Sequence, residues 1–281
     1  MGLFECTFYS DSLSRTITMN AIIPTDKTMF TQHEQRDIKE YKALYLLHGG
    51  LGSHVDWIGG TNIQRWAQDK DLMVFMPSGE NLFYIDIPET QGRFGKFIGE
   101  ELVEYTRKTF PLSHKREDTF IAGLSMGGYG ALVNGLKYNH TFGYIGSLSA
   151  GVIIDGIVDE APKITALSPK YLEDRSFWTR IFGDLSKLRG SDKDYKALAQ
   201  KVMAEKGDIP KIFMCCGTED FLLPENQEYR DFLRGINYPV DWFEGPGSHD
   251  WDFWDTFIKK FIDWLPLGEA KPGISSGHTY E

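Results

Sequence analysis

The sequence predicts an α/β protein whose central sheet is mostly parallel. Short apolar segments with strand character alternate along the chain with longer segments of helical periodicity. Each strand candidate ends in small or polar residues. This alternation is typical of βαβ units, in which helices cover both faces of the sheet. With 281 residues, 41% hydrophobic and 25% charged, the chain has the composition of a globular protein that buries a large core.

The opening residues alternate in polarity and predict an antiparallel hairpin at the sheet edge, interrupted at residues 10–14. In the last helix candidate, apolar residues recur at i, i+3, i+4 and i+7, which assigns its aromatic side chains to the core. The strand candidates after the hairpin are residues 43–47, 72–76, 119–123, 144–148, 212–216 and 240–243. The helix candidates are residues 63–69, 97–110, 127–138, 225–234 and 251–265.

Residues 152–206 do not follow the alternation. They combine a polar loop, an aromatic segment and a charged helical run over residues 192–206. We expect a small cap-like insertion that folds over the strand ends, within one domain over residues 1–265. Residues 266–281, rich in Gly, Ser and Pro, predict a flexible tail.

The formal charge of −10 argues against nucleic acid as a partner, because no basic run is present to neutralise phosphates. No apolar run reaches the roughly 18 residues that a membrane span requires, and the first residues do not form a signal peptide. These features predict a cytoplasmic protein that does not bind membranes. Its oligomeric state is left open, with a homo-oligomer among the alternatives.

The three cysteines do not form a metal or redox motif. Cys215 and Cys216 are adjacent in an apolar segment, where a disulfide between neighbours would be strained, so we expect buried free thiols. No Cys/His cluster has the spacing of a metal site.

The strongest motif is Gly-Leu-Ser-Met-Gly at residues 123–127, with Ser125 at its centre. It follows one strand candidate and opens a helix candidate, which is the context of the nucleophile elbow in the α/β-hydrolase fold. The turn is so tight that the positions flanking the serine must be small, as Gly123 and Gly127 are. Ser125 is therefore the predicted nucleophile.

A serine becomes a nucleophile when a base takes its proton, and in this fold the chain order is serine, acid, histidine. Three histidines follow Ser125. His140 lies about four helical turns beyond it, and His278 falls in the predicted tail. His249, in a glycine-rich loop before the last helix candidate, is the predicted general base.

The acid is expected after the penultimate strand, where Asp220 stands. Glu219 and Asp241 are the alternatives. Asp250 adjoins the histidine in sequence, which gives poor geometry for orienting its ring, and it fits the N-terminus of the last helix better.

The oxyanion that forms during ester cleavage needs preorganised N–H donors. The backbone N–H of Met126 is one candidate. The other is expected in the loop after residues 43–47, where we assign the N–H of Gly50, with that of Leu51 as the alternative. His48 precedes the nucleophile and is assigned a structural role in this loop.

With these residues placed, the chain resembles the esterase D-like branch of the α/β-hydrolases, and most closely the tributyrin-type esterases with related acetyl and feruloyl esterases. The resemblance extends from about residue 4 to residue 265 and is carried by four motifs, at residues 46–50 with Trp57, 119–131, 216–222 and 245–251. In that family the positions of Ser125, Asp220 and His249 form the triad. Many relatives carry Leu or Met where this chain has Gly50, which bears on the shape of the acyl pocket.

The resemblance implies a serine carboxylesterase that needs no cofactor and acts on short acyl or aromatic acyl esters of small molecules or oligosaccharides, including plant sugars. A thioesterase acting on S-formylglutathione, an acyltransferase and a binding protein that has lost catalysis are the alternatives. Asp-Trp-Asp-Phe-Trp after His249 is similar to the tributyrin-esterase side of the branch. The aromatic candidates for a substrate pocket, each with core packing as its alternative, are Trp57, Phe83, Tyr84, Phe177 and Trp178.

Overall fold

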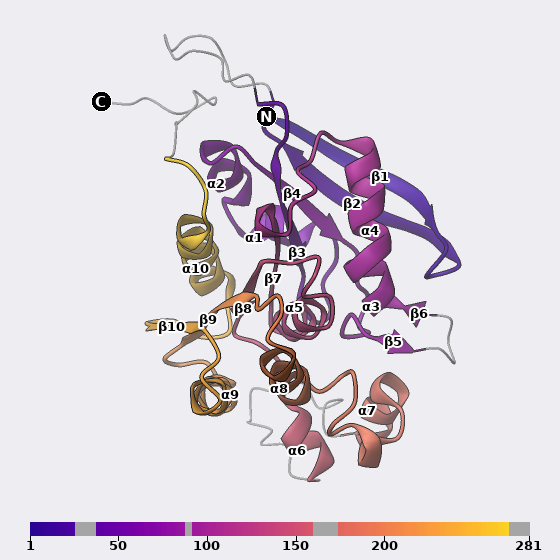
Figure 1. The fold of residues 1–281 in the computed structure, drawn as a ribbon, viewed down its shortest axis with the longest axis vertical. Coiled ribbons are helices and arrows are strands. Elements are labelled where there is room, and N and C mark those ends of the chain that lie inside the picture. Colours follow the sequence, from indigo (N-terminus) through magenta and orange to yellow (C-terminus); the bar gives the residue numbers. More distant parts are fainter. Residues whose placement is uncertain (26–37, 88–91, 160–173, 270–281) are drawn as a thin grey trace.

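An eight-stranded sheet runs through the centre of the molecule (Figure 1). The computed structural model describes residues 1–25, 38–87, 92–159 and 174–269. The strand order is β1-β2-β4-β3-β7-β8-β9-β10. The strands are β1 (Gly2–Ser10), β2 (Arg15–Ile23), β3 (Lys42–Leu47), β4 (Leu72–Pro77), β7 (Thr119–Leu124), β8 (Tyr144–Leu148), β9 (Lys211–Gly217) and β10 (Val240–Gly245).

The sheet is antiparallel at one edge and parallel elsewhere. β1 and β2 form the predicted hairpin, with Cys6 opposite Met19, and β2 pairs antiparallel with β4. All pairs from β4 through β3, β7, β8 and β9 to β10 are parallel. The predicted mostly parallel α/β-hydrolase sheet is confirmed.

Helices cover both faces of this sheet. On one face lie α1 (Asp56–Gly60), α2 (Ile63–Asp69) and α10 (Trp251–Trp264), which share one apolar cluster with the sheet. On the other lie α4 (Leu102–Thr109), α5 (Met126–Lys137), α8 (Tyr195–Glu205) and α9 (Leu223–Gly235). Figure 1 shows α2 and α10 on one side of the sheet and α4 on the other.

The central strands are apolar without interruption because both of their faces are buried. In β3, Leu44 and Leu46 pack toward the α10 face, whereas Ala43, Tyr45 and Leu47 pack toward the α5 face. Side chains of a strand point alternately to its two faces, so each strand contributes to both apolar clusters.

Several short elements were not predicted. The helix expected over residues 97–110 begins with a π-helical turn, Phe97–Glu101, before α4. The others include β5 (Asp86–Ile87), β6 (Gly92–Arg93), α1, α3 (Phe94–Lys96) and two 3-10 turns, Arg116–Asp118 and Leu185–Lys187. Elements of two to five residues carry too few positions to show a periodicity.

The segment predicted as a cap contains α6 (Ile154–Val158), α7 (Arg175–Phe182) and α8, and its residues 160–173 lie outside the described residues. α7 contacts the β4–β5 connection through Trp178 and Phe83. α8 instead packs against α5 and α9 through its apolar side. The charged run of the predicted insertion therefore belongs to the helical layer, because its buried residues need α5 as a partner.

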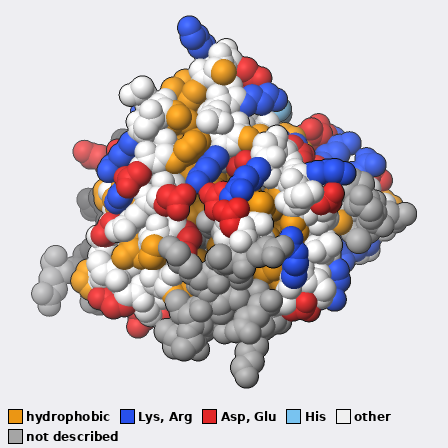
Figure 2. Space-filling view, turned by 90° about the horizontal axis from the view of Figure 1, so that it is seen from below, with side chains coloured by type: hydrophobic (Ala, Val, Ile, Leu, Met, Phe, Trp, Pro, Cys, Tyr) orange, Lys and Arg blue, Asp and Glu red, His pale blue; other side chains and the backbone are white. Residues whose placement is uncertain are grey.

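Figure 2 views the end of the molecule that carries α6 to α9. Basic and acidic side chains are interspersed there, without a continuous basic patch in the visible part. Arg189, for example, pairs with Asp155 and Asp159. Across the described ranges, no helix has the length and apolar character to span a bilayer. The cytoplasmic location stays a prediction, and residues 270–281 of the predicted tail lie outside the described part of the chain.

The packing of α10 on the sheet gives a test of the fold. Phe261 is fully buried and lies over Gly146 of β8, where an added Cβ would come within 2.8 Å of its ring. We expect Phe261→Ala to lower the free energy of unfolding by about 3 to 5 kcal/mol in urea denaturation. Thr256→Ala, on the exposed side of the same helix, is the matched control and should change it by less than about 0.5 kcal/mol. Equal effects of the two variants would contradict the assigned helix face.

Candidate active site

Ser125 occupies the sharp turn between β7 and α5. Its backbone has φ 53° and ψ −118°, a conformation that is strained for a residue with a Cβ. The main chain of this residue is tied on both sides. Its N–H donates to the carbonyl of Leu148, and its carbonyl accepts from the N–H groups of Gly151 and Tyr129. The strain is thus sustained by hydrogen bonds to the end of β8, to the loop that follows it and to α5.

The two glycines of the motif allow this turn by close backbone contact. A Cβ at Gly123 would lie 2.3 Å from the carbonyl oxygen of Gly127. A Cβ at Gly127 would lie 2.4 Å from the carbonyl oxygen of Leu47 and 2.6 Å from that of His48. The predicted need for small residues therefore has two sources, namely the turn itself and the approach of the β3 strand end.

The structure brings Ser125, His249 and Asp220 together. The Ser125 Oγ lies 3.0 Å from His249 Nε2. His249 Nδ1 lies 2.9 Å from Oδ2 and 3.1 Å from Oδ1 of Asp220. Since Asp220 accepts hydrogen bonds when ionised, it favours the tautomer that carries its proton on Nδ1 and leaves Nε2 as the acceptor for the serine hydroxyl.

Asp220 is an ionised carboxylate in a buried position. Its side chain has 0% exposure, and burial alone would raise its pKa. Hydrogen bonds from His249 and from the N–H of Leu222 outweigh burial, so the pKa of Asp220 lies below its ordinary value. The carboxylate is thereby held charged at neutral pH, which suits it to orient the imidazole that it bonds.

The alternative acids point elsewhere. Glu219 accepts the N–H of Gly247 at 2.7 Å and so braces the loop that carries His249. Asp241 accepts the indole N–H of Trp264, and Asp250 caps α10 by accepting the N–H of Phe253. Each of these three alternative carboxylates is thus hydrogen-bonded to a group other than the His249 ring. Among the carboxylates of the described residues, Asp220 is the one that bonds this ring.

The predicted oxyanion donors lie on the two loops beside Ser125. The N–H of Met126 is at the first position of α5, where no intrahelical partner exists. The N–H of Leu51 donates to Asn81 Oδ1 at 2.6 Å, which removes it as the alternative donor. Among the described residues, nothing accepts the N–H of Gly50.

His48 is the first residue of the loop that carries Gly50 and is almost fully buried. The N–H of Gly79 donates to its Nε2 at 2.8 Å, so the ring proton is on Nδ1, which lies 2.7 Å from the carbonyl of Gly49. Burial lowers the pKa of His48, which keeps the ring neutral. The structure places His48 where the sequence assigned it, as part of the loop framework.

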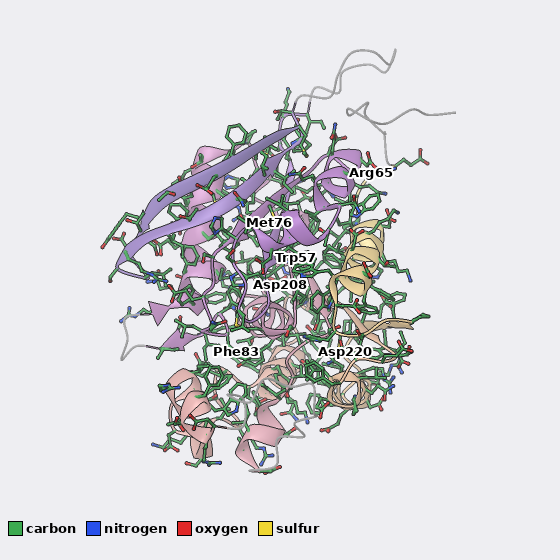
Figure 3. The ribbon with its side chains drawn as sticks, turned by 180° about the vertical axis from the view of Figure 1, so that it is seen from behind. Trp57, Arg65, Met76, Phe83, Asp208 and Asp220 are labelled. Atoms are coloured by element: carbon green, nitrogen blue, oxygen red, sulfur yellow. The ribbon has the colours of Figure 1, made fainter. Side chains whose placement is uncertain are left out.

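The aromatic candidates divide into two groups. Trp57 and Tyr84 are 1% and 0% exposed, and their polar groups donate to the carbonyls of Leu47 and His48. These two side chains hold the end of β3 and do not line an open pocket. For them the structure agrees with core packing, the alternative named for each aromatic candidate. Figure 3 shows Phe83 and Asp220 on opposite sides of α5. Phe83 lies on the side of α7 and Asp220 on the side of α9, and Trp57 is labelled as well.

Phe83 lies close to the loop that holds the elbow. A Cβ at Gly151 would lie 3.5 Å from the Ser125 carbonyl oxygen and 3.7 Å from the Phe83 ring. Trp178 packs against Phe83, and Phe177 packs against Trp178.

Sequence reasoning missed the aromatic surroundings of His249. The ring of Phe221 lies 4.7 Å from the imidazole, and that of Trp254 lies 5.0 Å away in a T-shaped arrangement. Trp251 then connects Trp254 to Trp57. The segment Asp-Trp-Asp-Phe-Trp after the histidine carried a signal for these contacts, but it was interpreted only through helical periodicity and the resemblance to tributyrin-type esterases.

An elbow serine hydrogen-bonded to a histidine, with a buried aspartate behind it, on a sheet of this topology defines a serine hydrolase of the α/β-hydrolase fold. The chain belongs to the esterase family, whose model, described as "Putative esterase", matches residues 10–266.

Comparison with known proteins agrees with this family. The chain is 44% identical to an acetyl esterase from Caldicellulosiruptor saccharolyticus, over 94% of this chain and 98% of the relative. Among solved structures it is similar to the fluorophosphonate-binding serine hydrolase FphF of Staphylococcus aureus, with a TM-score of 0.79 and 31% identity. The S-formylglutathione hydrolase FrmB of the same organism gives a TM-score of 0.78 and 31% identity. Both structural matches cover 94% of this chain and 98% of the other. The protein is a carboxylic ester hydrolase of the serine esterase type.

The close contact at Gly127 predicts the effect of a single methyl group. Gly127→Ala should lower ester hydrolysis at least about 10-fold and the free energy of unfolding by about 3 kcal/mol, because main-chain atoms must move to admit the Cβ. Gly235→Ala, where nothing lies within 4 Å, is the control and should raise the free energy of unfolding by about 0.5 to 1 kcal/mol. Wild-type activity in Gly127→Ala would contradict the tight elbow.

The lowered pKa of Asp220 predicts a pH dependence of stability. A carboxyl group whose pKa is lower in the folded state stabilises the fold above its unfolded value of about 3.9, and this contribution is lost as the pH falls through the folded value. The difference in the free energy of unfolding between wild type and Asp220→Asn should therefore shrink as the pH is lowered from 7 to 3. Asp208→Asn, which removes an exposed carboxylate, should change stability by less than about 0.5 kcal/mol at either pH. A difference that grows on acidification would contradict the direction of the shift.

Proposed function

We propose that Ser125, His249 and Asp220 are the catalytic triad of this esterase. The observation that carries the proposal is the unbroken hydrogen-bond chain from the Ser125 hydroxyl through the imidazole to the buried carboxylate of Asp220. Such a chain lets the serine lose its proton as it attacks, while the aspartate stabilises the imidazolium that results.

In the acylation step, Ser125 Oγ attacks the ester carbonyl carbon and its proton passes to His249 Nε2. The carbonyl oxygen becomes an oxyanion, for which the N–H groups of Gly50 and Met126 are the proposed donors. When the tetrahedral intermediate collapses, the bond to the alcohol oxygen breaks and His249 returns the proton to the leaving alcohol. The products of this step are an acyl-enzyme on Ser125 and a free alcohol.

Deacylation repeats the sequence with water as the nucleophile. His249 takes a proton from the water as it attacks the acyl carbon, and returns that proton to Ser125 Oγ as the carboxylic acid leaves. The chemistry uses only side chains and main-chain groups of the protein, so we propose that no cofactor takes part.

For the substrate, we propose esters of short acyl groups, from acetyl to butyryl, including acetyl groups on plant sugars. The name of the 44% identical relative, acetyl esterase, supports this choice. An aromatic acyl group is the second class we consider, and the name of the FrmB structure makes S-formylglutathione the thioester to test.

The nucleophile is tested by Ser125→Ala with p-nitrophenyl acetate. We expect kcat to fall by about 10⁴-fold or more, because attack then requires water in place of the serine. Ser186→Ala, an exposed serine in the insertion, is the control and should retain wild-type kcat. Wild-type protein that cleaves neither the acetate ester nor its longer homologues would refute the triad as a working site.

The acyl preference is tested by a panel of p-nitrophenyl acetate and butyrate, acetylated xylan fragments, methyl ferulate and S-formylglutathione. We expect the highest kcat/KM for acetyl and butyryl esters, with at least about a tenfold lower value for an octanoyl ester, since each poorly placed contact removes transition-state stabilisation. A preference for S-formylglutathione would instead assign the thioesterase function. Transfer of acetyl to an added sugar in excess of hydrolysis would identify an acyltransferase.

A further inference from the structure

The loop after β4 forms a support for the oxyanion loop. Residues 79–84 follow the end of β4 and lie against residues 48–51, which follow β3. The N–H of Gly79 donates to His48 Nε2, and the hydroxyl of Tyr84 donates to the His48 carbonyl at 3.0 Å. These contacts are buried and fix the inner end of the oxyanion loop.

A third contact lies at the exposed end of the same support. Asn81 Oδ1 accepts the N–H of Leu51 at 2.6 Å, and both side chains are exposed. Leu51 has φ 65°, in the left-handed region that a leucine rarely adopts. Glu80, in the supporting loop, has a positive φ of 51° as well. Backbone conformations of this kind persist where surrounding bonds hold them.

The two peptide planes that flank Gly50 are each held by a side chain. The N–H of Gly50 and the carbonyl of Gly49 belong to one rigid, planar peptide unit. His48 Nδ1 donates to that carbonyl, which turns the N–H of Gly50 to the opposite side. The next plane contains the N–H of Leu51, which Asn81 holds. A glycine between the two planes has wide conformational freedom, so the direction of its N–H depends on both bonds.

We propose that Asn81 is a positioning residue of the oxyanion hole. By accepting the N–H of Leu51 it maintains the left-handed conformation at that residue, and so keeps the N–H of Gly50 unbonded and directed at the substrate oxygen. This inference rests on the proposed function, in which Gly50 is an oxyanion donor. Asn81 does not touch the reacting atoms; it acts through the main chain of residues 50 and 51.

The inference predicts a specific kinetic signature. Loss of the acceptor releases one of the two peptide planes that flank Gly50, so the N–H of Gly50 is held from one side only. Transition-state stabilisation then falls while ground-state binding of substrate stays the same. An interaction made only in the transition state lowers kcat and kcat/KM equally. A displaced donor is expected to lower both by about tenfold, less than the complete loss of a donor.

The test compares Asn81→Ala and Asn81→Leu, which both remove the acceptor, with wild type on p-nitrophenyl acetate. We expect kcat to fall about tenfold in both, KM to stay within about twofold, and the pH dependence of kcat to keep its midpoint because the triad is untouched. The rate of covalent labelling by a fluorophosphonate should fall in parallel, since phosphonylation also places an oxygen in the oxyanion hole. The thermal midpoint should stay within about 2 °C of wild type, because the side chain is exposed.

Asn139→Ala is the matched control, a loop asparagine whose amide donates to the carbonyl of Asp208 and which is remote in sequence from the triad. It should retain wild-type kcat. A kcat within twofold of wild type in both Asn81 variants would overturn the inference, as would a rise in KM at unchanged kcat, which would make Asn81 a substrate contact. Failure of the proposed function looks different, because then wild type itself would hydrolyse no ester.

Discussion

The strained backbone of Ser125 is the constraint on which the rest of the site depends. Its φ of 53° and ψ of −118° lift the side chain out of the end of β7 at the N-terminus of α5. A residue in this conformation relaxes unless its neighbours prevent it. Here the N–H and the carbonyl of Ser125 are bonded to Leu148 and Gly151, on the neighbouring strand end and the loop after it, so the sheet itself sustains the strain.

The order of the strands brings the other residues of the candidate site to the strained serine. β3 and β7 are neighbours, so the loop with Gly50 lies beside Ser125. β9 and β10 are also neighbours, so Asp220 and His249, which follow their ends, meet each other. Between the two pairs runs β8, whose following loop contacts Ser125 through Gly151. Because the carboxyl ends of parallel strands lie along one edge, four loops distant in sequence converge on one serine.

The parts that sequence could predict either have a local cause or follow from the chain order of the α/β-hydrolase fold. The strands have continuous apolar runs, the elbow has its glycines, and His249 followed from chain order and the exclusion of His140 and His278. The acid could be narrowed to Asp220 with two alternatives, and the side-chain directions of Glu219 and Asp241 were needed to separate them.

The parts that sequence could not predict depend on contacts between distant segments. Trp57 and Tyr84 look like pocket aromatics, yet their polar groups bind the carbonyls at the end of β3. Phe221 and Trp254 look like ordinary core residues, yet they pack on His249. The left-handed conformation of Leu51 also has no local signal, since Leu disfavours it and a side chain 30 residues away holds its N–H.

The most direct test of the account is to locate the reactive side chain. Wild-type protein would be labelled with a fluorophosphonate, digested, and mapped by tandem mass spectrometry, with the His249→Ala variant treated in parallel. The account predicts a single phosphonyl group on Ser125 in wild type and labelling slowed by about 10³-fold or more in the variant, because the serine then lacks its base. A label on any other serine, or equal labelling of Ser125 without His249, would contradict it.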